Sequence, residues 1–342
     1  SRYEISENDP PVESALVDLV PELHSCDGAG VGAIAHVLYT HPKIDIYTTI
    51  KNYIALMRPK QYLKNGFVFA PLFFALPVGN PEILISAGIA FVLFSLLASA
   101  VYIFNDYCDI ESDRLHPKKR FRPLASGKVS KTGACILTAG LLAISITGCL
   151  AFLNTQVLSL MLLYLSINVI YTVKLKHVSL IDIFIISTGF VIRLFVGSCA
   201  SGLELSYSII VMTFLLSLFL AFAKRRDDVL ILMETGRKMR KNITGYNLEF
   251  INSAMSTISS IILITYIMYT ISPEIIAKHQ TDKLYLTSLF VILGILRYQQ
   301  ITFIYKNSGV PTEILMKDKF IQLSIGFWII SFLCIKYFRW FV

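Results

Sequence analysis

The chain has 342 residues, of which 55% are hydrophobic and only 16% are charged. Soluble domains usually carry about 25% charged residues, so this composition argues against a soluble enzyme, a disordered protein and a nucleic-acid-binding protein. The formal net charge is +8, and in a membrane protein such an excess marks cytoplasmic loops. The six cysteines form no C-x-x-C pair, which argues against a zinc site or a disulfide framework.

The first 50 residues differ from the rest of the chain. They contain Pro10-Pro11 and several glycines, and they lack a long apolar run. No signal-peptide pattern is present. We predict that residues 1–54 form a cytoplasmic extension or a linker, to which the sequence assigns no function, and that residues 55–342 form a membrane domain.

Long apolar runs dominate the remainder of the chain. A membrane-spanning helix needs roughly 20 mostly apolar residues, and the runs do not alternate as the strands of a membrane barrel would. The first run is the weakest, because it is short and Pro71 and Pro77 interrupt it. We predict an all-α integral membrane protein with nine transmembrane helices, over residues 62–79, 83–105, 132–152, 156–173, 180–201, 206–223, 248–272, 283–305 and 319–340.

Lysine and arginine alternate between the two ends of these predicted helices. Most of the 31 basic residues lie before the first predicted span or in the loops after the second, fourth, sixth and eighth. The loops after the first, third and fifth hold none, and the loop after the seventh holds only Lys278 and Lys283. Cytoplasmic loops carry the excess of basic residues, so the pattern supports nine spans and a cytoplasmic N-terminus.

An acidic motif follows the second predicted span. Asp106, Asp109 and Asp113 are spaced i, i+3, i+7, so on a helix they would share one face. Three such carboxylates repel one another unless a cation lies among them, and Mg²⁺ usually binds through one or two carboxylates plus substrate phosphates. The motif predicts a Mg²⁺ site; the alternative is a solvated acidic helix end.

A dense basic run, from Arg114 to Gly127, comes directly after the acids. Arg and Lys side chains bind phosphate oxygens through charge-assisted hydrogen bonds. Acids beside bases suit a metal-chelated polyphosphate, although the basic run alone is also typical of a cytoplasmic loop.

Charged residues inside the predicted spans are few. Asp182 lies just inside the fifth span and Arg193 near its middle, where an ionised group usually faces a partner or a wet cavity. The two are separated by roughly 16 Å along a straight helix, so they cannot pair directly. For Arg193 an ion pair with another carboxylate and an anion contact in a central cavity both stay open, and Arg297 in the eighth span is either a structural partner or a lipid-phosphate contact.

The segment from Asn105 to Gly127 resembles the first aspartate-rich motif, N-D-x-x-D-x-x-x-D, of the UbiA superfamily of intramembrane prenyltransferases. Nine helices with large cytoplasmic loops after the second and sixth also resemble that family. The similarity covers about residues 55–342. Further segments resemble the phosphoribosyltransferase branch of the superfamily: 58–65, 171–197, 223–227, 296–298, 311–313 and 318.

The resemblance implies nine helices around a central cavity, open to the cytoplasmic side and laterally to the bilayer. It implies a Mg²⁺-dependent enzyme that transfers 5-phosphoribose from phosphoribosyl diphosphate to a polyprenyl phosphate such as decaprenyl phosphate, releasing pyrophosphate. The product would be a precursor of lipid-linked arabinose for cell-wall polysaccharide. The expected location is the bacterial cytoplasmic membrane, with the active site on the cytoplasmic side; no nucleic-acid partner is expected, and a homo-oligomer is compatible with the sequence.

The resemblance also implies roles for individual residues. Asp106, Asp109 and Asp113 are the expected catalytic and Mg²⁺-binding residues. Arg193, Arg225 and Arg226 are expected at the acceptor phosphate. Several residues of the donor set also have a structural alternative. Lys60 and Lys64 are alternatively lysines that snorkel to the membrane interface, Tyr171 an interface anchor, and Lys224 part of a plain basic anchor. The expected donor-phosphate residues are Lys60, Lys64, Asn65, Asn105, Lys118, Arg120, Arg122, Tyr171, Lys174, Asp182 and Lys224.

The sequence departs from the wider superfamily in one respect. Many members carry a second D-x-x-x-D motif after the sixth span, whereas this chain has the sequence KRRDD at 224–228. A donor diphosphate, a 5-phosphate and an acceptor phosphate need more cationic side chains than prenyl transfer does. Prenyl transfer from a prenyl diphosphate to an aromatic or other acceptor is the alternative enzyme, and a transporter is disfavoured because the spans carry almost no charge at mid-depth.

Overall fold

The computed structural model describes residues 46–76, 80–117, 119–236, 241–305 and 311–338. Contacts divide the chain into two units, residues 1–51 and 52–342. Most of the predicted extension, residues 1–45, lies outside the described residues, and helix α3 (Ile46–Met57) runs across the predicted boundary at residue 54. The described residues contain helices and loops but no strand, which confirms the predicted all-α class.

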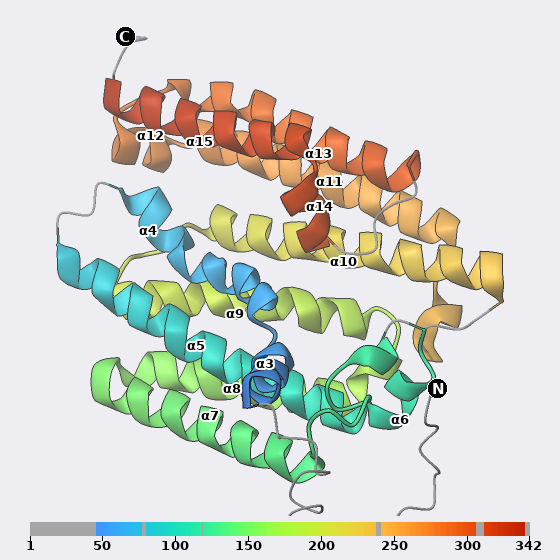
Figure 1. Cartoon of the computed structure of the whole chain (residues 1–342). Helices are drawn as coiled ribbons and strands as arrows, with labels where there is room; N and C mark the ends of the chain where they lie inside the picture. The colour runs from blue at the N-terminus through green and yellow to red at the C-terminus, as the bar shows by residue number, and fades with distance from the viewer. Residues whose placement is uncertain (1–45, 77–79, 118, 237–240, 306–310, 339–342) are drawn as a thin grey trace, which may run out of the picture. The chain divides into compact units, whose positions relative to one another are not determined.

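Within the described residues, eight helical segments are long and apolar enough to cross a membrane. Their bounds agree with eight of the nine predicted spans, except that α5 and α10 extend further than expected. Figure 1 shows them side by side, with α9 and α10 in the middle of the stack. They are α5 (Pro81–Cys108), α7 (Lys131–Phe152), α8 (Thr155–Val173), α9 (Ile181–Ser201), α10 (Tyr207–Thr235), α11 (Leu248–Ile271), η6 (Lys283–Thr287) continued by α13 (Ser288–Phe303), and α15 (Lys319–Phe338).

The first predicted span, residues 62–79, does not form one long helix. The chain instead forms a 3₁₀ helix, η2 (Pro59–Phe69), followed by the short α4 (Ala70–Ala75), and residues 77–79 lie outside the described part. Proline has no backbone N–H and is favoured in the first turn of a helix, and Pro71 is the second residue of α4. The count of nine membrane-spanning helices therefore stays a prediction, as do the central cavity and its openings.

Local sequence explains where most long helices begin. An Asn or Ser side chain just before the first turn accepts a hydrogen bond from a backbone N–H that has no partner inside the helix. Gly202 and Gly236, both with φ of +67°, follow the last residues of α9 and α10, as glycine often does at helix C-termini. The capping residues are Asn80 of α5, Ser130 of α7, Asn154 of α8, Ser206 of α10 and Asn247 of α11.

Packing joins the helices into a continuous series. Helix α5 packs on α7, α8 and α9; α9 packs on α10; and α11 joins α10 to α13, which packs on α15. The short helices η2 and α4 pack against α9 and bring Val68 into a buried cluster with residues of α5, α8 and α9. Two short helices lie at loops: α12 (Pro273–His279) and α14 (Pro311–Lys317).

Gly197 of α9 permits an unusually close approach of η2. A Cβ atom built on Gly197 would lie 1.9 Å from the carbonyl oxygen of Val68, and backbone cannot move aside as a flexible side chain can. We expect Gly197→Ala to lower the free energy of unfolding by about 3 kcal/mol, the upper end for overpacked cores. Thermal unfolding of the purified protein in one detergent would measure the change.

Gly140 of α7 is the matched control for that substitution, because a Cβ there would meet no atom within 4 Å. Since alanine favours helix over glycine by about 1 kcal/mol, Gly140→Ala should leave the melting temperature unchanged or raise it. Equal melting temperatures for the Gly197→Ala variant and the wild type would contradict the close approach.

His279, at the end of α12, is a buried base. Its side chain is 6% exposed, neither ring nitrogen has a hydrogen-bond partner among the described residues, and the ring packs edge-on against Phe332. Burial, together with the positive charges of Lys336 and Lys278, lowers the pKa of His279 to about 4.

This lowered pKa predicts acid-sensitive stability. The unfolded chain takes up the proton near pH 6.5, whereas the folded protein does so only near pH 4, so the stabilisation is complete above pH 6.5 and is lost as the pH falls from 6.5 to 4. At pH 5 the loss should be about 2 kcal/mol. Between pH 7 and pH 5, the melting temperature of the His279→Gln variant should fall by less than that of the wild type. Equal decreases would contradict the prediction.

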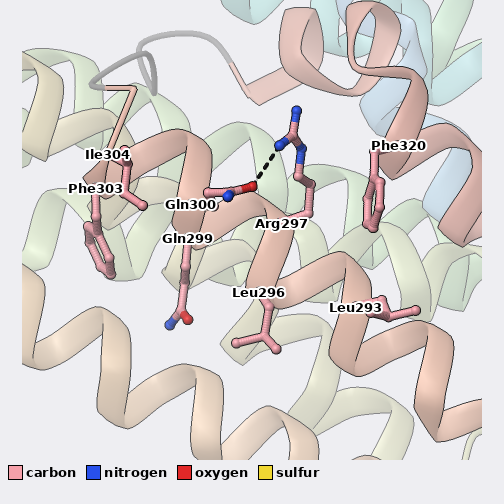
Figure 2. Close-up of a pocket in the computed structure, with 8 residues that line it drawn as sticks. All are labelled: Leu293, Leu296, Arg297, Gln299, Gln300, Phe303, Ile304 and Phe320. Atoms are coloured by element: carbon pink, nitrogen blue, oxygen red, sulfur yellow. Dashed lines mark hydrogen bonds between the residues drawn. The ribbon is translucent and has the colours of Figure 1, made fainter.

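An apolar groove lies on the outer surface of α13 and α15 (Figure 2). Five of its eight lining residues are apolar: Leu293, Leu296, Phe303, Ile304 and Phe320. Arg297 stands at its edge and donates to Gln300 Oε1 at 2.6 Å and, through Nη2, to Asp318 Oδ2 at 2.8 Å. The hydrogen bonds from Arg297 hold the pKa of Asp318 below its usual value. These contacts favour the structural alternative for Arg297.

Candidate active site

The acidic motif lies where α5 ends. Asp106 is in the last turn of α5, Asp109 occupies a turn with φ −99° and ψ 6°, and Asp113 is in the short helix α6 (Ile110–Arg114). The spacing predicted that the three acids share one face of a single helix. The structure instead divides them between α5 and α6, with a turn at Asp109. The turn at Asp109 separates its carboxylate from those of Asp106 and Asp113, so Asp109 has a different basic partner from the other two.

Asp106 and Asp113 converge on one nitrogen atom. Nη1 of Arg122 lies 3.0 Å from Asp106 Oδ1 and 2.6 Å from Asp113 Oδ2. A second guanidinium, that of Arg58, donates to the same Oδ1 of Asp106. Asp106 is 2% and Asp113 3% exposed, so both carboxylates are buried beneath basic side chains.

Arg58 is fixed by its backbone as well as by this ion pair. Its φ of 56° and ψ of 58° place it in the left-handed region, which non-glycine residues rarely adopt, and the next residue is Pro59. Sparsely populated backbone conformations cluster at functional sites. The left-handed turn between α3 and η2 aims the guanidinium at Asp106, 48 residues away in sequence.

Asp109 has a separate set of partners. Lys176 Nζ lies 2.5 Å from its Oδ1, and Asn105 Nδ2 donates to its Oδ2 at 3.1 Å. Thr172 of α8 donates in turn to Asn105 Oδ1 at 3.4 Å. These contacts tie the acidic motif to α8 and to η4 (Leu175–His177), which carries Lys176.

The donor set at Asp106 and Asp113 fits a hard divalent cation. Two carboxylates already place oxygens within 3.0 Å of a single cationic nitrogen, and Mg²⁺ is commonly held by one or two carboxylates with substrate phosphates completing its shell. A cluster of three acidic, His or Cys ligands is not formed by the described residues. The geometry thus suits a site of two carboxylates, with Asp109 beside it.

Arg193 and Asn65, predicted at different phosphates, are bonded to each other. Arg193 Nε donates to Asn65 Oδ1 at 2.8 Å, Nη1 to the Gly189 carbonyl oxygen at 2.6 Å and Nη2 to Tyr164 Oη at 3.0 Å. The rings of Phe94, Tyr164 and Phe190 lie within about 5 Å of the guanidinium. Among the described residues Arg193 has no carboxylate partner within 4 Å. The structure therefore does not show the ion pair with a carboxylate that was one of the two alternatives for Arg193.

Asp182 and Arg225 form a buried ion pair. Arg225 Nε lies 2.8 Å from Asp182 Oδ2 and its Nη1 lies 2.9 Å from Asp228 Oδ2, with Asp182 0% and Arg225 1% exposed. Tyr246 donates to Asp182 Oδ1 at 2.7 Å and accepts from the backbone N–H of Leu180. Burial and the bond to Asp182 raise the pKa of Tyr246. The contacts give both predicted phosphate-binding residues an internal partner.

Arg226, the next residue of α10, lies in a third environment, against α11 and α13. Its Nε donates to Asn252 Oδ1 at 2.9 Å and its Nη1 to the Thr302 carbonyl oxygen at 2.6 Å. The residues KRRDD at 224–228, expected in a loop, belong to α10, which continues to Thr235. The basic run there stays helical because no Gly or Pro precedes Gly236.

The other predicted donor residues are spread around these clusters. Lys60, Arg120, Lys174 and Lys224 are exposed, Lys64 and Tyr171 are partly buried, and Lys118 lies outside the described residues. In the same basic loop, burial and the nearby charge of Lys119 lower the pKa of His116. The phosphate contacts of all these residues stay predictions.

Four contact residues were not predicted from the sequence. Arg58 and Lys176 bind the acids directly, Tyr246 holds Asp182, and Tyr164 holds Arg193. Arg58 could have been found, because it is basic and begins the segment 58–65 that resembles the phosphoribosyltransferase branch. Nothing in the sequence marks Tyr164 or Tyr246 among the 17 tyrosines.

The sequence matches the model of the UbiA prenyltransferase family over residues 66–324. The chain belongs to this family. It is 33% identical to decaprenyl-phosphate phosphoribosyltransferase of Corynebacterium glutamicum over 81% of this chain and 84% of the relative. It is 31% identical to the enzyme of the same name from Mycolicibacterium smegmatis, over 82% of this chain and 91% of that one.

Solved structures of the UbiA family share the fold. A UbiA homologue from Archaeoglobus fulgidus, bound to GPP and Mg²⁺, superposes with a TM-score of 0.61 at 18% identity, covering 83% of this chain and 99% of that one. A UbiA homologue from Aeropyrum pernix gives a TM-score of 0.58 over 80% of this chain. With its family and the eight long apolar helices found among the described residues, the chain is an integral membrane transferase.

Proposed function

We propose that this protein transfers 5-phosphoribose from phosphoribosyl diphosphate to a polyprenyl phosphate, releasing pyrophosphate. The observation that carries the proposal is the convergence of two buried carboxylates on one cationic nitrogen, bordered by further basic side chains. The names of the relatives that match most of the chain supply the substrate class.

Asp106 and Asp113, with Asp109 beside them, would hold Mg²⁺, which the UbiA homologue from Archaeoglobus fulgidus binds together with a prenyl diphosphate. Bound there, Mg²⁺ would neutralise charge on the departing diphosphate. Arg58, Arg122 and Lys176 would bind the remaining phosphate oxygens through charge-assisted hydrogen bonds. The acidic residues thus serve the donor through a metal, and the basic residues serve it directly.

The bond changes need little proton transfer. An oxygen of the acceptor phosphate forms a bond to C1 of the ribose while the bond from C1 to the diphosphate oxygen breaks, with inversion at C1. The acceptor is already an anion, so the chain need not supply a strong general base. Positioning and electrostatic stabilisation would provide most of the acceleration.

The cytoplasmic face is the side we propose for this chemistry, in the bacterial inner membrane. Phosphoribosyl diphosphate is a charged, water-soluble donor, and the loops rich in basic residues indicate the cytoplasmic side. The acceptor lipid would enter from the bilayer, and the product would serve as a precursor of lipid-linked arabinose.

The test is a transfer assay with purified protein, Mg²⁺, phosphoribosyl diphosphate and decaprenyl phosphate. We expect lipid-linked phosphoribose and pyrophosphate, and no product when EDTA is present. A parallel reaction would supply a prenyl diphosphate and 4-hydroxybenzoate. A prenylated aromatic product without lipid-linked phosphoribose would replace the proposal with prenyl transfer.

A further inference from the structure

Within the described part of the chain, three basic side chains pair with the three motif carboxylates. Arg58 and Arg122 contact Asp106, Arg122 also contacts Asp113, and Lys176 contacts Asp109. The bases come from three separate segments, so this pairing results from the fold and not from neighbours in sequence. A divalent cation that binds here must share these carboxylates with charges of its own sign.

Arg122 is the base in direct competition with such a cation. A single nitrogen atom bridges Asp106 and Asp113, so it takes up the place between two carboxylates where a bridging cation would bind. A cation and a guanidinium that share the same oxygens at about 3 Å repel each other strongly, since the effective dielectric constant is low at a buried site. Cation binding therefore requires Arg122 to move.

Exposure shows that Arg122 has room to move, whereas the carboxylates do not. The Arg122 side chain is 27% exposed, but that of Asp106 is 2% exposed. The backbone of the basic loop is held without this side chain, because Arg122 N–H donates to the Lys119 carbonyl oxygen at 2.9 Å and its own carbonyl oxygen accepts from Ser126. Arg58 is similarly exposed, at 25%, but among the described residues it contacts Asp106 and not Asp113, so it does not take up the place between the two carboxylates.

We infer that Arg122 is an exchangeable counter-ion, which bridges Asp106 and Asp113 until a divalent cation replaces it and then binds the diphosphate that arrives with that cation. The inference deepens the proposed function, on which it rests only for the presence of a diphosphate. Exchange makes the two ligands cooperative: the diphosphate gives the displaced guanidinium a new partner, so cation and diphosphate should bind together better than either binds alone.

Opposite effects on two ligands test the exchange. We expect Arg122→Gln to bind Mn²⁺ roughly tenfold more tightly than the wild type in the absence of any phosphate ligand, because the carboxylates lose a competing cation. The same variant should bind inorganic pyrophosphate roughly tenfold more weakly in saturating Mg²⁺, since one charge-assisted hydrogen bond is gone. Electron paramagnetic resonance of free Mn²⁺ and equilibrium dialysis of labelled pyrophosphate, both on the full chain in nanodiscs, give the two affinities.

Arg114→Gln is the matched control for charge. Arg114 belongs to the same basic segment, is 51% exposed and contacts Glu111 and the Ala125 carbonyl oxygen instead of the three motif acids. Its Mn²⁺ and pyrophosphate affinities should equal those of the wild type. If Arg114→Gln tightened Mn²⁺ binding as much as Arg122→Gln does, the effect would be one of net charge, and the inference would be overturned.

Arg122→Lys keeps the test valid if the Gln variant does not fold. Lysine retains the charge but cannot present a planar guanidinium, so the Lys variant should bind Mn²⁺ more tightly than the wild type, a comparison that does not need the Gln variant. Unchanged or weaker Mn²⁺ binding in the folded variants would overturn the exchange. Because neither measurement uses a phosphoribosyl donor, failure of the transfer assay with these results intact would reject only the proposed donor.

Discussion

Asp106→Asn should reduce turnover in the transfer assay at least a thousandfold while the protein stays folded. Asp106 accepts from both Arg58 and Arg122 and lies 2% exposed at the centre of the cluster. Asparagine keeps the shape and can still accept a hydrogen bond, but it removes the negative charge that a divalent cation needs. Removing one preorganised electrostatic contact typically lowers turnover 10²–10³-fold, and here the cation and both arginines are affected together.

Glu111→Gln is the control for this substitution. Glu111 is one turn away on α6, its side chain is 79% exposed, and it pairs only with Arg114 among the described residues. Its turnover should stay within about twofold of the wild type. The two variants should have equal melting temperatures within a few degrees; an Asp106→Asn protein that is folded and fully active would refute the assigned site, and loss of folding in Asp106→Asn and Asp109→Asn alike would make the acids structural.

Arg225→Met should be the most destabilising single change, lowering the free energy of unfolding by about 3–5 kcal/mol. Asp182 is 0% exposed and, of its side-chain partners among the described residues, would keep only the Tyr246 hydroxyl. A buried charge without its counter-ion is far more costly than the absence of the pair. Urea-induced unfolding in mixed micelles, or thermal unfolding in one detergent, would measure the loss.

The double variant Asp182→Leu/Arg225→Met separates structure from substrate binding. Removing both charges should restore most of the lost stability, as replacing buried ion pairs by apolar residues often does. Lys283→Met, which breaks an exposed pair with Asp282, should have no measurable effect on the melting temperature. A stable Arg225→Met protein with weakened acceptor binding would instead support the phosphate contact expected from the sequence.

Much of the architecture could be predicted because membrane helices are coded locally. Eight of the nine predicted spans agree with helices of the structure, since each depends on a run of apolar residues, and an Asn or Ser caps five of them. The prediction for residues 62–79 was wrong as a single helix, because Pro59 and Pro71 allow two shorter ones. The end of α10 was also misplaced, since the basic residues after position 223 looked like a loop but contain no helix breaker.

The family resemblance, the acidic motif and its position at the end of a membrane helix could all be predicted, because they depend on residues adjacent in the chain. The partners of each charge were decided only by the tertiary structure: Arg58 meets Asp106 across 48 residues, Arg225 meets Asp182 across 43, and Arg193 meets Asn65 across 128. Hydrogen bonds act over about 3 Å, so which base neutralises which acid follows from how η2, α5, α9 and α10 pack together. Composition and residue spacing do not predict that packing.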